Sequence, residues 1–241
     1  MPVIWAICRR DVIAAFTTPL AWLVLACWTL LTGGIFAHTL DAVHGTAGSD
    51  MPLFVDTLDA GVLMLSLLAP AITMTSFAQE RVQGTMQLLL TVPVREHQLV
   101  LGKFLAAFLV LASLVAATLV QPAILLLVST VHGPHLAAGY LGLLLVCALF
   151  AALGVWISLL VDSPIAAYVL TFGAIAVLIL VGISLRGGPL NGLGEAIGLG
   201  ERIAPFMRGE VRLGGVAYFA ASTAACLVMA HGALLARRMH G

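Results

Sequence analysis

Six apolar runs constrain this chain more than any other feature of its sequence. They cover residues 20–40, 58–78, 104–131, 136–161, 165–185 and 216–236. A helix needs about 20 apolar residues to cross the hydrocarbon layer, and a chain in lipid must satisfy its backbone hydrogen bonds internally. Charged residues make up only 9% of the chain, against about 25% in soluble domains. We therefore predict an all-α membrane protein with six transmembrane helices, folded as a single domain over residues 1–241.

Ahead of the first run, the sequence predicts an amphipathic helix over residues 3–16. Its apolar face comprises Trp5, Cys8, Val12 and Phe16. Arg10 lies nearly opposite, and Arg9, Arg10 and Asp11 would be costly inside lipid. We expect an interfacial helix whose main residues are Trp5, Arg9, Arg10 and Phe16. The alternative is a ragged extension of the first span.

The longest polar interruption in the first two-thirds of the chain is the segment 76–103. Within it, the loop 79–98 carries Glu80 and Arg81 among apolar residues spaced as on a half-buried helix: Val82, Met86, Leu89 and Leu90. Pro93 breaks that helix, and a new one can start behind it. A short amphipathic helix held at a membrane face between two spans predicts a contact site for a separate protein.

The charges of the loops predict the orientation of the chain. Seven basic residues fall on one side of a six-span arrangement and four on the other: Arg9, Arg10, Arg81, Arg95, Lys103, Arg237 and Arg238 against Arg186, Arg202, Arg208 and Arg212. This bias favours cytoplasmic termini. The outer loop 186–215 offers residues 195–199 and 201–207 as short helices. It reads as a solvated cap over the helix ends or as a substrate gate.

Motifs that carry chemistry are missing from the sequence. Gly102-Lys103 is followed by Phe104 and lacks the upstream glycines of a nucleotide-binding loop. His132 and His135 flank a Gly-Pro turn with no nearby carboxylate, which favours a wet loop over a metal site. No charge lies deep in a span, which argues against a proton relay. Net charge is zero, so nucleic acid is not an expected partner. We expect no catalytic or metal site in this chain.

Prolines and glycines interrupt several of the predicted spans. Pro70 and Pro122 predict kinks in the second and third spans. Gly33-Gly34, Gly173 and Gly182 would allow close helix approach, either within the subunit or across a dimer. The four scattered cysteines read as buried small apolar residues.

The central loop resembles the loop between spans two and three of ABC-2-type permease subunits, the membrane halves of ATP-driven exporters. The branch includes gliding-motility and nitrous-oxide-reductase-maturation permeases. The matching positions are Glu80, Arg81, Gly84-Thr85, Leu88–Leu90, Pro93 and Gly102-Lys103. The stretches CRRDVIAAFTTPLAW and APFMRGEVRLGGVAYF are similar to the family's charged start and to its entry into the last span. Gln79, Val82, Gln87 and Glu210 depart from the family's usual residues.

The resemblance implies the permease subunit of an exporter in the bacterial inner membrane. It implies a second permease subunit (the same chain or a paralogue), two ATPase subunits that bind ATP and Mg²⁺, and a place for an accessory protein outside the membrane. Membrane lipid is a further expected partner. The coupling residues would be Glu80, Arg81, Gly84, Thr85, Met86 and Leu89. A sodium-coupled or other secondary transporter, a membrane-embedded enzyme and a non-transporting membrane anchor are the alternatives. The substrate stays open.

Overall fold

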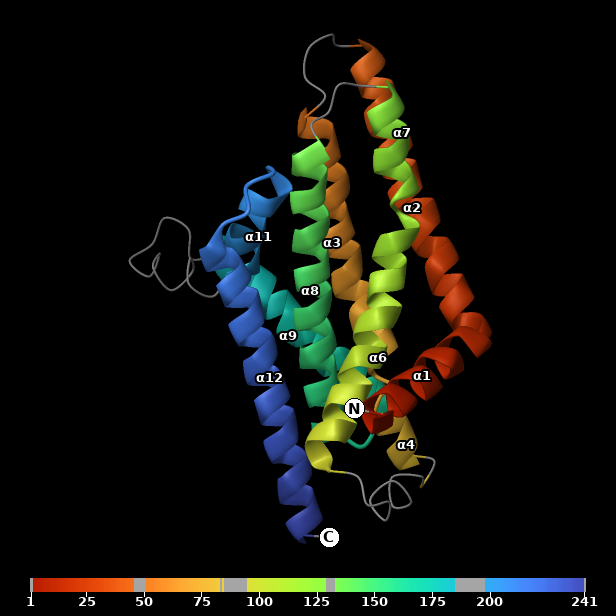
Figure 1. Ribbon diagram of the computed structural model, residues 1–241, viewed down its shortest axis with the longest axis vertical. Helices are drawn as coiled ribbons and strands as arrows, with labels where there is room; N and C mark the ends of the chain where they lie inside the picture. Colours follow the sequence, from red (N-terminus) through yellow and green to blue (C-terminus); the bar gives the residue numbers. More distant parts are fainter. Residues whose placement is uncertain are drawn as a thin grey trace.

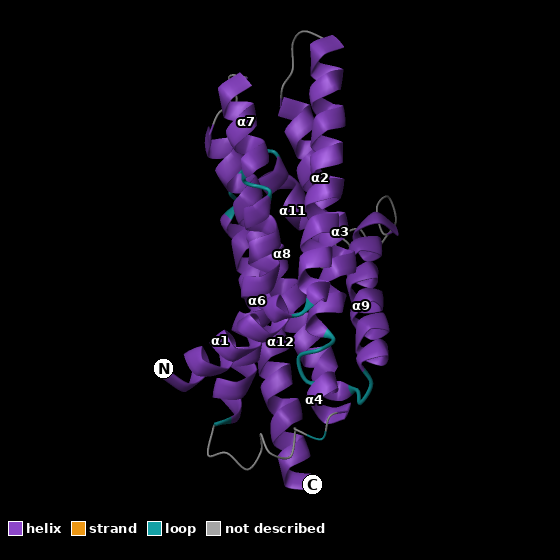
Figure 2. Ribbon diagram, turned by 90° about the vertical axis from the view of Figure 1, so that its right-hand side faces the viewer, coloured by secondary structure: helices purple, strands orange, loops and turns teal. Residues whose placement is uncertain are grey.

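The computed structural model describes residues 2–45, 51–82, 84, 95–128, 133–184 and 198–240 (Figure 1). The helices are α1 (Pro2–Thr17), α2 (Pro19–Gly45), α3 (Met51–Thr73), α4 (Ala78–Val82), α6 (Glu96–Ala117), α7 (Val120–Val128), α8 (Gly133–Leu160), α9 (Pro164–Ser184), α11 (Leu199–Met207) and α12 (Leu213–His240). Figure 2 shows helices and loops throughout this part of the chain. Of the predicted helix over residues 195–199, residues 195–197 lie outside the described residues, and Leu199 is the first residue of α11.

Within the part of the chain that the structure describes, six stretches are long and apolar enough to cross a membrane. They are Ala21–His38, Val55–Val82, Glu96–Ile124, Pro134–Leu160, Pro164–Gly182 and Leu213–Ala236. The prediction of an all-α protein with six membrane-spanning helices is confirmed. The N-terminus, α4 and the C-terminus lie toward one end of the bundle, and α11 lies toward the other (Figure 1).

Helix α8 is the centre of the bundle and packs against α3, α6, α9, α11 and α12. Small residues let its neighbours approach: a methyl group at Gly154 would overlap Thr73 of α3, and one at Gly142 would lie 2.8 Å from Cβ of Phe206. Most of the core is therefore packed around one helix.

Three glycines expected to permit close helix approach do not do so within the subunit. A methyl group at Gly33, Gly34 or Gly173 would have no neighbour within 4 Å. Gly182 does lie against another segment, since a methyl group there would be 3.0 Å from Cα of Gly198. Other close approaches occur at Gly142 and Gly154 of α8, the helix that is surrounded by others, and at Gly102 of α6.

The third span breaks just before Pro122. Helix α6 ends at Ala117, and α7 begins after a turn at Thr118 and Leu119. Because proline has no N–H, it cannot donate to the carbonyl four residues back, which belongs to Thr118. The hydroxyl of Tyr140 donates to that carbonyl at 3.0 Å. The same carbonyl also accepts from the N–H of Gln121 at 3.0 Å, so the turn itself and a neighbouring helix both satisfy it at the predicted kink.

Helix α1 runs across the lower end of α6 and meets α2 at an elbow (Figure 1). Cys8 is buried, and a methyl group at Gly102 of α6 would lie 2.9 Å from Cγ2 of Ile7. Trp5 is 63% exposed, so the apolar face expected to unite Trp5 and Cys8 is divided. The division arises because α1 buries one side against α6 and leaves Trp5 outside that contact. Phe16 packs edge-on against Trp22 at 6.2 Å between ring centres.

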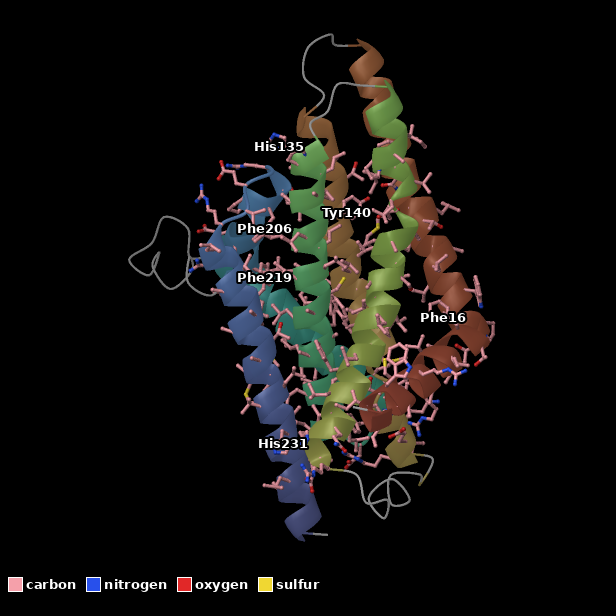
Figure 3. The ribbon with its side chains drawn as sticks, in the orientation of Figure 1. Phe16, His135, Tyr140, Phe206, Phe219 and His231 are labelled. Carbon is pink, nitrogen blue, oxygen red and sulfur yellow. The ribbon has the colours of Figure 1, made fainter. Side chains whose placement is uncertain are left out.

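The short helix α11 is packed into the bundle more deeply than a solvated cap would be. Ile203, Phe206 and Met207 are buried, and the ring of Phe206 lies 6.3 Å from that of Phe219 in α12. Figure 3 shows Phe206 and Phe219 together beside α8. The amphipathic spacing of α11 accounts for this, because its apolar side chains fall on one face.

Candidate coupling site

Helix α4 is held at its start by a side chain from the end of α8. The backbone N–H groups of Phe77 and Ala78 both donate to Oγ of Ser158, each at 3.0 Å. All three residues are completely buried. The first N–H groups of a helix have no partner within the helix, so Ser158 acts as a remote cap for α4.

Arg81 fixes the other end of α4 to the same place. Its Nη2 donates to the carbonyl of Leu159 and its Nη1 to the carbonyl of Val161, each at 2.8 Å. The guanidinium also pairs with the carboxylate of Asp162. A cation is favourable at a helix C-terminus, where carbonyls lack partners within the helix. Arg81 therefore caps α8, and α4 and α8 cap each other.

Glu80 faces the opposite way, into a group of four charged side chains that we call the charge cluster: Arg10, Asp11, Glu80 and Lys103. Nζ of Lys103 lies 2.6 Å from Oε1 of Glu80 and 3.0 Å from Oδ2 of Asp11. Nη2 of Arg10 lies 2.9 Å from the same Glu80 oxygen. The charge cluster therefore joins α1, α4 and α6.

The burial of Lys103 makes these ion pairs consequential. Lys103 is only 4% exposed, and its ammonium also lies 5.4 Å from the centre of the Phe77 ring. A buried charge whose partner is removed is strongly destabilising, by about 3–5 kcal/mol. Burial alone would lower the pKa of Arg10, but its contacts with Asp11 and Glu80 raise that pKa above its ordinary value. The two carboxylates therefore favour the charged form of Arg10.

The outer side of α4 carries different residues. Val82 and Gly84 are exposed there, with Val82 at 67%. Gly84 has φ of +70°, and a methyl group there would have no neighbour within 4 Å. Positive φ favours glycine, so this residue sets the turn that leaves α4.

The structure brings together only part of the predicted site. Glu80 and Arg10 meet in the charge cluster, whereas Arg81 binds the end of α8. Arg9 and Trp5 are exposed outside the charge cluster. Thr85, Met86 and Leu89 lie outside the described residues. The coupling and interfacial roles of these residues stay predictions.

Sequence reasoning did not assign site roles to Asp11, Lys103 and Ser158. Asp11 and Lys103 carried a usable signal, because charges beside apolar spans need opposite partners. Ser158 carried none, since a serine within a long apolar run is unremarkable. Among the described residues, no three His, Cys, Asp or Glu side chains gather as a metal site would need.

Comparison with known proteins agrees with this architecture. Residues 48–207 match the family described as ABC-2 family transporter protein. The chain is also 30% identical over 113 residues to the probable ABC transporter permease protein NosY of Pseudomonas aeruginosa. That match covers 46% of this chain and 41% of the relative, so the chain spans less than half the length of that protein.

Proposed function

Because the chain belongs to the ABC-2 family of transporter permeases, we propose that it is the membrane subunit of an ATP-driven exporter. In this proposal it pairs with a second permease subunit, and two separate ATPase subunits bind ATP and Mg²⁺. The chain has no nucleotide-binding loop of its own, so the ATPase must drive it mechanically. A sodium-coupled carrier would have no need of the ATPase.

The observation that carries this proposal is the double attachment of α4. A helix of five residues is too short to be stable alone, so its position depends on the contacts it makes. Ser158 and Arg81 join it to α8, and Glu80 joins it to α1 and α6. A force on α4 would therefore move three helices together. We assign α4 and the segment after it, residues 83–95, as the element that contacts the ATPase.

The exposed residues of α4 are the ones we assign to the ATPase contact. Val82 is a large apolar side chain in an exposed position at a charged end of the molecule, where a partner would bury it. Glu80 and Arg81 have side chains only 14% and 16% exposed, so we assign them to positioning α4. Direct docking of Glu80 on the partner would require the charge cluster to open.

The test uses Val82→Glu and a matched control, Val211→Glu. Val211 is 53% exposed at the opposite end of the molecule. Each permease variant is co-expressed with the ATPase of the same transporter, and the amount of ATPase that co-purifies is measured. We expect Val82→Glu to reduce co-purification by about tenfold, because burying an unpaired carboxylate costs more than 1.4 kcal/mol. Val211→Glu should bind like wild type.

Equal ATPase binding by both variants would refute the assignment of α4. The purified permease alone should hydrolyse no ATP, and its complex should hydrolyse it. Hydrolysis by the permease alone would refute the whole proposal.

Gly84 provides a test that separates backbone conformation from bulk. Asparagine tolerates positive φ but adds a side chain, whereas alanine is small and disfavours positive φ. If bulk against the ATPase matters most, Gly84→Asn should reduce ATPase binding more than Gly84→Ala. If the turn matters most, the order reverses. Equal binding by both variants and wild type would exclude Gly84 from the contact.

We propose the bacterial inner membrane as the location, with α4 and both termini in the cytoplasm. The seven-to-four distribution of basic residues supports this orientation. Single cysteines at Ser49 and Asn191 should react with a membrane-impermeant thiol reagent in intact cells. Protection of both, with labelling at Gln83, would reverse the orientation.

A further inference from the structure

A cavity of about 650 Å³ lies between the α1–α2 elbow and the bundle. Helices α1, α2, α3 and α6 form its walls, together with the turn before α4 and Glu80. Phe16, labelled at the elbow in Figure 3, is part of the lining. The volume falls within the ~300–1,000 Å³ typical of small-molecule sites.

The cavity is polar at one end and apolar at the other. All four residues of the charge cluster line the polar end, together with Thr75 and Gln79. The walls beyond are mainly apolar, with Val24 and Leu25 from α2, Ile72 from α3, and Val110 and Leu114 from α6. Thr18 and Ser113 also line the cavity. A ligand that fills this cavity must have a charged or polar end and a hydrocarbon end.

The length of the apolar wall matches one leaflet of a bilayer. From Lys103 to Leu114 the α6 backbone rises about 16 Å, at 1.5 Å per residue. Half of the hydrocarbon core of a bilayer is about 15 Å thick. Charged residues cannot lie deep in lipid, so the charge cluster lies near the headgroup level. The cavity therefore has the depth and polarity of a single lipid in the leaflet on the α4 side.

The charges select among lipid headgroups. Arg10 and Lys103 balance Asp11 and Glu80, so the polar end has no net charge but presents both signs side by side. A headgroup with a phosphate and an ammonium finds an opposite charge for each. A headgroup with only a negative charge would meet two carboxylates, and like charges in contact are costly.

We propose that this cavity binds one phospholipid with a zwitterionic, amine-bearing headgroup. Its phosphate lies near Arg10 and Lys103, its ammonium lies near Asp11 and Glu80, and an acyl chain runs along α6. This inference does not depend on the coupling role of α4, because it concerns the permease subunit without any ATPase.

The test is native mass spectrometry of the permease from bilayer discs with equal phosphatidylethanolamine and phosphatidylglycerol. Wild type should retain one phospholipid per subunit, with phosphatidylethanolamine enriched by about tenfold, as expected for one additional charge-assisted contact. Asp11→Asn removes one partner of the ammonium and should reduce that enrichment. Retention of phosphatidylglycerol at an equal or higher level by wild type would refute the headgroup assignment.

The second part of the test fills the cavity with a larger side chain. Ala107→Phe from α6 and Ala21→Phe from α2 place a ring in the cavity from two different walls, so the test survives if one variant fails to fold. Ala116→Phe is the matched control, because it makes the same change at an exposed position of α6 outside the lining. Both filling variants should lose the retained lipid and the control should keep it. Unchanged retention in a folded filling variant, or retention of a molecule other than a phospholipid, would overturn the proposal.

Discussion

Ser158→Ala tests whether α4 owes its position to α8. The change removes one oxygen atom and adds no bulk. In the structure that oxygen accepts hydrogen bonds from the N–H groups of Phe77 and Ala78, both at 3.0 Å. Both residues are completely buried, so water cannot replace the lost acceptor without local opening.

The magnitude follows from the two donors left without a partner. Each buried, unsatisfied polar group costs about 1–3 kcal/mol. Since α4 lies at one end of the bundle and can separate from it to reach water, the lower half of the sum applies, about 2–4 kcal/mol. For a chain of this size, 1 kcal/mol shifts the melting temperature by about 2–4 °C, so the expected decrease is about 5–15 °C.

Ser66→Ala is the control, because it makes the same substitution at another buried serine. The Ser66 hydroxyl donates to the carbonyl of Leu63 within the same helix, at 2.6 Å. Its loss leaves no orphaned N–H group. Thermal unfolding of both variants in detergent gives the comparison, and hydrogen exchange of the amides in residues 77–82 shows where the change occurs.

Two results would refute this reasoning. Equal melting temperatures for Ser158→Ala and Ser66→Ala would mean that the two N–H groups find other acceptors at no cost. A lower melting temperature with unchanged exchange in residues 77–82 would mean that Ser158 stabilises α8 and not α4.

The remaining predictions concern packing and charge around the same helices. Gly154→Ala should destabilise the protein by about 2 kcal/mol, because the added methyl group overlaps Thr73. Gly173→Ala, the control, should leave thermal unfolding unchanged. Equal effects of the two variants would contradict the close approach of α3 and α8 at Gly154. Lys103→Met should lower the free energy of unfolding in denaturant by ~3 kcal/mol, and a loss under ~1 kcal/mol would mean that its ion pairs are solvated. Burial, and then Asp11, raise the pKa of the Cys8 thiol. Its reactive thiolate should therefore be scarce at neutral pH, and alkylation by iodoacetamide, followed by mass spectrometry, should be slow and accelerate as pH rises. Rapid alkylation at neutral pH would refute the burial of Cys8 against α6.

The sequence predicts the helical layout well because the bilayer imposes simple rules. Six apolar runs yield six candidate spans, and Pro122 predicts the break between α6 and α7. Helix α6 begins at Glu96, behind Pro93, where the sequence allows a new helix to start. It therefore includes Lys103, which precedes the apolar run and is buried against Glu80 and Asp11. A hydropathy profile scores each charged residue by its type, so it cannot detect a charge that is neutralised by tertiary contacts.

The candidate site was predictable only where local sequence determines it. The stretch around Glu80 and Arg81 stands out as a polar interruption, and the resemblance to ABC-2 permeases singles out both residues. Their partners are distant in sequence: Arg10 lies 70 residues from Glu80, and Asp162 lies 81 residues from Arg81. Local sequence patterns cannot predict contacts between residues so far apart in the chain. The direction in which each side chain points is therefore known only from the folded structure.

The attachments of α4 also determine which helices a motion of α4 would reach first. Through Ser158 and Arg81, α4 is attached to the end of α8, which is the most buried of the candidate spans, with 72% of its residues inside the protein. Glu80 reaches α1 and α6 through the charge cluster, while α2 is 17% buried, follows α1 after the elbow and also contacts α3 and α6. In the coupling that we propose, a displacement of α4 therefore acts on the centre of the bundle directly. The outer helix α2 can follow by bending at the elbow, which is where the lipid-sized cavity lies.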